Sequence, residues 1–205
     1  MICSFTEDLE FSQGGRMQTD MDILKQSIRK CVSVKKTSIE EDKKGVDYIV
    51  TLEDGATIRI DAKRRRKGAS KSWTRRDEPE LAIETWSVIT TDGQRKKGWT
   101  FNTGKECDLI LYVFDPEDTD KYYLIPFPLL RQASINNLIA WDYRYRQRTQ
   151  RSIGWKSKCI MVPASVVLEA VKAEMMKQLT TDIEYPEVAK NMIGYDILCG
   201  EVSKQ

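Results

Sequence analysis

Two aspartates and one lysine, placed on neighbouring strands of a predicted β-hairpin, are the residues of this chain best suited to chemistry. Asp47 lies near the start of the first strand, and Asp61 and Lys63 lie near the end of the second. Asp54-Gly55 lies between the two alternating runs, and such a pair is a strong hairpin signal. Two carboxylates and an ammonium at one end of a hairpin could hold a divalent cation and act on a bound anion.

The register of this hairpin can be derived from burial. A two-residue loop would mix apolar and charged residues on both faces, whereas a three-residue loop with left-handed Gly55 separates them. The apolar face then holds Tyr48, Val50, Leu52, Ala56, Ile58, Ile60 and Ala62, and the other face holds Asp47, Ile49, Thr51, Thr57, Arg59, Asp61 and Lys63. Asp47 would lie opposite Asp61, about 5 Å away at Cβ. A shared cation would relieve their repulsion; the alternative is that solvent at the strand ends does so.

The lack of histidine narrows the chemistry further. A chain of 205 residues with no histidine has no Ser-His-Asp triad, no Cys-His pair and no histidine-bound zinc. Its five cysteines form no CxxC pair, which disfavours a zinc site or a disulfide framework and favours a reducing, cytoplasmic setting. No apolar run is long enough to span a bilayer, so no membrane partner is expected. Hydrolysis would have to rest on carboxylates, lysine and a hard cation.

Positive charge is concentrated in two segments. Lys63 to Arg76 holds eight basic residues and no acidic one, and Arg144 to Lys158 is a second basic stretch. Such segregation predicts a polyanion-binding face, with a solvated loop as the alternative. The expected nucleic-acid contacts are Arg64, Arg65, Arg66, Lys67, Lys71, Trp73, Arg75 and Arg76. Trp73 could stack on an unpaired base or simply pack; Tyr143 to Arg148 forms a second contact or a helix end covering apolar surface.

The remaining pattern predicts one α/β or α+β domain, with a central mixed β-sheet flanked by helices. Helices are expected at about 20 to 33, 129 to 145 and from 163 onward, with a polar loop at 35 to 45. Strands are expected at 46–52, 56–63, 81–89, 107–114, 122–126 and 158–162. We expect a flexible N-terminal segment at 1–18, the domain at 19–180 and a C-terminal tail at 181–205.

The hairpin resembles the metal site of the PD-(D/E)XK nuclease superfamily. Asp47 matches the first acid and Asp61-Ala62-Lys63 matches the triplet, although Val46 replaces the proline. The resemblance implies a restriction-endonuclease-like fold and hydrolysis of phosphodiester bonds in DNA. It implies Mg²⁺ or Mn²⁺ held by Asp47 and Asp61, with Lys63 acting on the water or the transition state.

Three further acids are weighed against this resemblance. Glu84, in the middle of an apolar strand, would be a third catalytic acid or a partner of Lys63, or else would face the surface. Superfamily members often add an acid from the first helix, for which Asp20 and Asp22 are candidates. Their position in the first turn favours a capping role instead.

Two rival functions remain open. The chain could be a catalytically inactive module that keeps the nuclease fold and binds nucleic acid or protein, or an interaction protein with a basic loop. The complete Asp/Asp/Lys set favours the enzyme, and metal binding discriminates among the three. Duplex or branched DNA is the expected partner. RNA as substrate, endo- or exonuclease action and a homodimeric state are left open.

Overall fold

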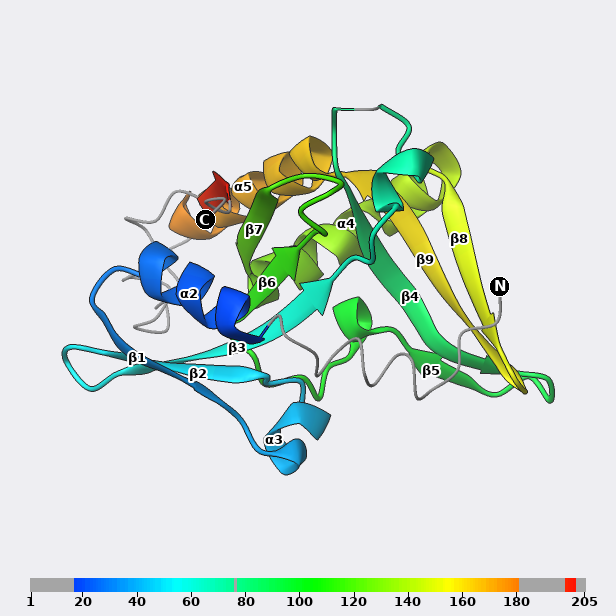
Figure 1. The fold of residues 1–205 in the computed structure, drawn as a ribbon. Helices are drawn as coiled ribbons and strands as arrows, with labels where there is room; N and C mark the ends of the chain where they lie inside the picture. Colours follow the sequence, from blue (N-terminus) through cyan, green and yellow to red (C-terminus); the bar gives the residue numbers. More distant parts are fainter. Residues whose placement is uncertain (1–16, 76, 181–197, 202–205) are drawn as a thin grey trace.

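The structure of this chain is a computed structural model that describes residues 17–75, 77–180 and 198–201. It is an α+β fold in which two β-sheets lie side by side with helices against them (Figure 1). The larger sheet has the order β1 (Cys31–Lys36), β2 (Tyr48–Leu52), β3 (Thr57–Arg64), β6 (Leu109–Val113), β7 (Lys121–Pro126), β10 (Leu198–Glu201). The smaller has the order β5 (Arg95–Lys97), β4 (Glu80–Thr90), β9 (Trp155–Pro163), β8 (Gln147–Ser152). The helices are α2 (Met17–Ser27), α3 (Ile39–Lys43), α4 (Phe127–Arg144) and α5 (Ala164–Thr180), with 3₁₀ helices η1 (Ala69–Ser72) and η2 (Trp99–Phe101).

The β2–β3 hairpin has the register derived from its sequence. Val50 pairs with Ile58 and Tyr48 pairs with Ile60. Gly55, in the three-residue loop, has a φ of 83°, a left-handed conformation that glycine adopts without strain. The predicted sorting of apolar and polar faces is therefore confirmed.

One face of the larger sheet is covered by α2. Ile23, Leu24 and Ile28 pack on Val50 and Ile60, within a cluster that continues onto β6. Alternate residues of β2 and β3 point to this face, so burying it fixes the direction of all the others.

The opposite face of the larger sheet packs against the smaller sheet and helices α4 and α5. Ile110 and Ile125 meet Leu130 of α4, Val167 of α5 and Ile160 of β9 in one cluster. The only parallel pair of the described strands joins β3 to β6. Because parallel strands need a long crossover, the chain between them has room for β4 and β5 of the second sheet.

Several predicted elements differ in the structure. The helix expected at about 20 to 33 ends at Ser27, and Lys30, with a φ of 60°, turns the chain into edge strand β1. The polar loop at 35 to 45 contains α3, which begins with a Ser38–Glu41 capping box. Pairing with β2 therefore overrides the helical spacing of Cys31 and Val32.

The structure also differs from the prediction at the two ends of the chain and in the second sheet. The expected segment 1–18 lies outside the described residues up to 16 and then enters α2; from the tail at 181–205, β10 pairs antiparallel with β7. Strand β8 was not predicted, and the strand expected at 81–89 belongs to the second sheet rather than to the central one. No helix of the described residues is long and apolar enough to cross a membrane.

Candidate active site

Asp47 lies immediately before β2, where its side chain turns toward the end of β3. Its main-chain N–H donates to the carbonyl of Ile60 (2.7 Å), and its Oδ2 accepts the N–H of Ala62 (2.7 Å). The carboxylate thus takes a backbone hydrogen bond in the middle of the Asp61-Ala62-Lys63 triplet. This contact holds Asp47 beside Asp61, as the predicted register required.

Asp61 is almost completely buried, 2% exposed, and two lysines compensate its charge. Lys63 Nζ donates to Oδ1 at 2.8 Å. Lys105 Nζ lies 2.8 Å from Oδ2, yet this buried oxygen accepts no hydrogen bond of good geometry. A carboxylate buried this deeply is costly unless cations stay close to it.

Lys105 is a member of the site that the sequence did not reveal. It lies in the loop before β6, and its side chain is only 5% exposed. A hydrogen bond from the N–H of Glu106 to the carbonyl of Lys44 (3.1 Å) holds this loop beside Gly45. A Cβ at Gly45 would lie 2.4 Å from the Lys105 ammonium, so the glycine makes room for it. A single lysine in a polar loop carries no periodic signal, which is why it was missed.

Glu84 reaches the same site from β4 of the second sheet. Its Oε2 accepts the N–H of Trp99 (2.9 Å), and a Cβ at Gly98 would lie 2.1 Å from its carbonyl oxygen. The close approach of Gly98 therefore locks η2 onto β4. Burial raises the pKa of Glu84, and the positive charges of Lys63 and Lys105 oppose that rise. Glu84 thus senses the charge of Lys63, while the direct partner of Lys63 is Asp61 and that of Glu84 is the Trp99 N–H.

Burial and neighbouring charges shift the pKa values of Asp47 and Lys63. Burial, reinforced by the Asp61 carboxylate, raises the pKa of Asp47 to about 7, against the pull of Lys63. Burial opposes the charge of Lys63, but Asp61 and Asp47 outweigh it and raise its pKa above the ordinary value. Burial and the neighbouring Asp61 charge thus favour the protonated form of Asp47.

The carboxylates of Asp47 and Asp61 fit a divalent cation. The two carboxyl groups lie near each other, and burial with the Asp61 charge raises the pKa of Asp47, so a divalent cation between them would favour the ionised form of both. Among the described residues, no group of three or more acidic or cysteine side chains could hold a metal. Mg²⁺ nevertheless needs few protein ligands, because it usually keeps several waters and binds through one or two carboxylates.

The thiols near the site are poor nucleophiles. Burial, together with the nearby Asp61 carboxylate, raises the pKa of Cys107 to about 12. Burial beside Glu84 raises the pKa of Cys159 to about 12 as well. Because only the thiolate is nucleophilic, both cysteines stay inert near neutral pH.

Two of the expected nucleic-acid contacts are structural residues. Arg64 points to the α2 face, where its side chain, 12% exposed, forms a buried ion pair with Asp20. Asp20 lies in the first turn of α2, as expected, but it also accepts the hydroxyl of Tyr48 (3.0 Å), so its side chain joins the helix to β2 and β3. Trp73 is 9% exposed and packs edge-to-face on Phe114, which leaves no surface for a base.

The other expected contacts lie in different surroundings. Lys67 pairs with Glu117 and Arg75 with Glu78, whereas Lys71 is exposed. Arg65 and Arg66 are half-buried, and Arg65 lies close enough to Tyr112 and Cys159 to affect their pKa values. Arg76 lies outside the described residues. The segment is therefore partly neutralised and partly buried, instead of forming one continuous basic rim.

Comparisons with known proteins do not extend this geometry, since no family model, no curated protein and no solved structure matches the chain.

Proposed function

We propose that this protein is a metal-dependent nuclease of the PD-(D/E)XK type that hydrolyses phosphodiester bonds in DNA. The observation that carries the proposal is the convergence of Asp47, Asp61 and Lys63 at one end of a hairpin. The raised pKa of Asp47 supports it, because a bound cation would allow both carboxylates to ionise. The nuclease reading thereby accounts for an arrangement that otherwise costs stability.

Asp47 and Asp61 would hold one Mg²⁺ or Mn²⁺ ion. Bound there, the ion would lower the pKa of a water molecule and neutralise charge on the phosphate. Its positive charge would oppose the rise in the pKa of Asp47. The Ala62 N–H would keep the Asp47 carboxylate oriented, since it donates to Oδ2.

Lys63 is the residue placed to act on the phosphate. Its side chain is 28% exposed, and its ammonium lies 5.8 Å from the centre of the Trp99 ring. The Trp99 ring limits the movement of the Lys63 ammonium on one side, and the hydrogen bond to Asp61 Oδ1 holds it close to β3. A fixed cation of this kind stabilises the negative charge that develops on the pentacovalent transition state. Glu84, whose pKa the charges of both lysines lower against burial, would act as a positioning residue beside them.

The test is cleavage of plasmid, linear and branched DNA with Mg²⁺, with Mn²⁺ or with chelator. We expect cleavage only with a metal. Asp61→Asn should lower turnover by about a thousandfold or more while preserving DNA binding. Lys63→Met should slow cleavage by about a hundredfold and leave Mn²⁺ binding, measured by titration calorimetry, unchanged.

Asp54→Asn is the matched control, because Asp54 lies in the exposed turn at the other end of the same hairpin and bonds only locally to Ala56. It should cleave like the wild type. Cleavage by the wild type in chelator, or Mn²⁺ binding that survives loss of both Asp47 and Asp61, would show that the proposal is wrong. Mn²⁺ binding without cleavage of any substrate would favour an inactive binding module.

A further inference from the structure

Five cations lie in two adjacent rows on one face of the outer half of the smaller sheet. Directly paired residues of antiparallel strands share a face, so the register defines each row. The first row is Arg95, Ile89, Lys156 and Arg151, and the second is Lys97, Trp86, Lys158 and Thr149. We call these eight residues the basic sheet face. It holds no acidic residue.

The cations of the basic sheet face are mostly left without acidic partners. Among the described residues, only Lys158 of the five forms an ion pair, with Asp142 at 3.5 Å. Arg151 pairs directly with Lys156 across the strands, and like charges in that position destabilise a sheet. Asp92, at the nearby hairpin tip, bonds to Thr90 and Gln94 instead. The sheet therefore carries an electrostatic cost that an anionic partner would remove.

The centre of this face is apolar. Ile89 and Trp86 are half-buried, each flanked within its row by cations of the neighbouring strands, and the Arg95 guanidinium lies 5.5 Å from the centre of the Trp86 ring. Neighbouring strands are about 4.8 Å apart, so one row of four residues spans about 15 Å. A surface of this size with cations around an aromatic centre suits a nucleic-acid strand, whose phosphates pair with the cations while a base or sugar covers the ring.

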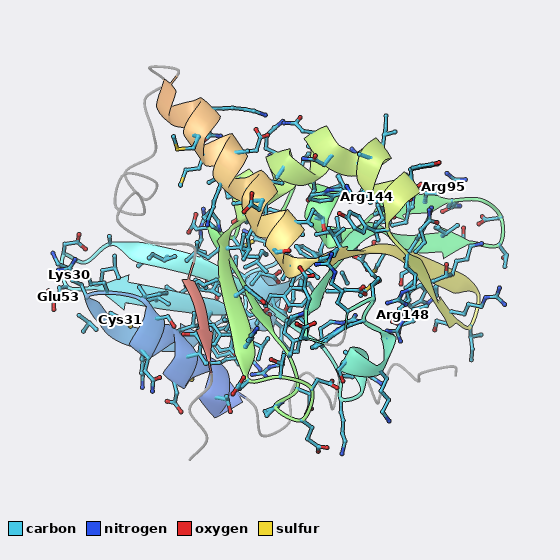
Figure 2. All side chains as sticks on the ribbon, turned by 90° about the horizontal axis from the view of Figure 1, so that it is seen from above. Lys30, Cys31, Glu53, Arg95, Arg144 and Arg148 are labelled. Carbon is cyan, nitrogen blue, oxygen red and sulfur yellow. The ribbon has the colours of Figure 1, made fainter. Side chains whose placement is uncertain are left out.

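This face is separate from the active site. The row Glu84, Cys159 and Arg148 lies on the other face of the same sheet, toward the lysines of the site. Figure 2 shows Arg95, Arg144 and Arg148 at one end of the molecule, with Lys30 and Glu53 at the other. Arg144, the last residue of α4, thus lies toward the same end of the molecule as Arg95.

We propose that the basic sheet face binds a nucleic-acid strand through its phosphates, as a second contact distinct from the site of cleavage. The proposal does not depend on the nuclease activity, since binding can be measured when no metal is present. A protein partner with an acidic segment is the competing occupant, but the half-buried Trp86 ring among the cations favours a strand whose bases can stack on it.

The test is the double variant Arg151→Gln/Lys156→Gln, compared with Lys35→Gln/Lys36→Gln. The control pair is exposed, lies on edge strand β1 of the other sheet and changes the net charge equally. Binding of a labelled single strand and of the same sequence as a duplex is measured by fluorescence anisotropy in chelator at several salt concentrations. Thermal unfolding of both variants checks that they fold, and we expect the first to be at least as stable as the wild type.

The expected result is weaker binding by the first variant, with a salt dependence reduced by about two in the slope of log Kd against log salt. The control should match the wild type. A loss confined to the single strand or to the duplex supports the proposal and identifies the form that is bound. The proposal is overturned if the slopes are unchanged for both forms of DNA, or if the control loses affinity equally. It is also overturned if polyglutamate displaces the labelled DNA at a lower concentration of charge than unlabelled DNA does. The first variant should still cleave DNA at low salt, because its active-site residues are unchanged. This measurement separates a loss of binding at the basic sheet face from a failure of the active site.

Discussion

Replacing Asp47 by asparagine should make the metal-free protein more stable, even though it should abolish cleavage. The substitution keeps the shape of the side chain, and an asparagine oxygen can still accept the Ala62 N–H. What it removes is the charge of a half-buried carboxylate beside Asp61. The gain in stability should depend on pH, because the wild-type carboxyl changes its protonation and asparagine does not.

The size of the gain follows from the raised pKa. Burial and the Asp61 charge raise the pKa of Asp47 from 3.8 to about 7, so the folded state holds the proton more tightly than the unfolded state does. The wild type therefore loses stability as the pH rises from about 4 to about 7, and the loss levels off above that range. Each factor of ten in proton affinity corresponds to about 1.4 kcal/mol, which gives at most about 4 kcal/mol. We expect about 2 to 4 kcal/mol, since solvent reaches part of the side chain.

Urea unfolding in chelator, at several values between pH 5 and pH 8, measures this difference. The free energy of unfolding of Asp47→Asn minus that of the wild type should grow with pH. Saturating Mn²⁺ should narrow the difference, because at a hundred times its Kd a ligand stabilises the wild type alone by about 2.7 kcal/mol. A difference that stays constant from pH 5 to pH 8 would refute the assignment of the raised pKa to Asp47.

Two further substitutions test the surroundings of the site. Lys105→Met removes an ammonium 2.8 Å from the buried Asp61 carboxylate, so it should lower stability in chelator by about 3 kcal/mol, and Mn²⁺ should restore part of the loss. Thermal unfolding with and without Mn²⁺ measures this, and an equal loss in both conditions would contradict the role of Lys105 as a counter-ion. Arg64→Met leaves Asp20 buried without its cation and should cost about 3 to 5 kcal/mol by urea unfolding. The salt dependence of DNA binding should stay unchanged in this variant. A smaller slope of log Kd against log salt would show that Arg64 does contact nucleic acid.

The hairpin was predictable because its information is local. Successive side chains of a strand alternate between faces, so the apolar set Val50, Ile58 and Ile60 also determines where Asp61 and Lys63 point. Gly55 selects the loop length, and the structure has the expected pairs. The long helix α4 and the apolar strand β6 were recognisable for the same reason, since their periodicity extends over many adjacent residues.

Packing between distant elements decided the rest. Glu84 comes from a second sheet, Lys105 comes from a loop, and both reach Asp61 or its lysines only after the chain has folded. Trp73 and Arg64 belong to a basic stretch in the sequence. In the structure, however, Trp73 packs in the core against Phe114, and Arg64 forms an ion pair with Asp20. Alternation along a strand follows from covalent geometry, and the sequence alone determines it. Which loop crosses which strand depends on the sum of many weak contacts, and these leave no pattern of their own in the order of the residues.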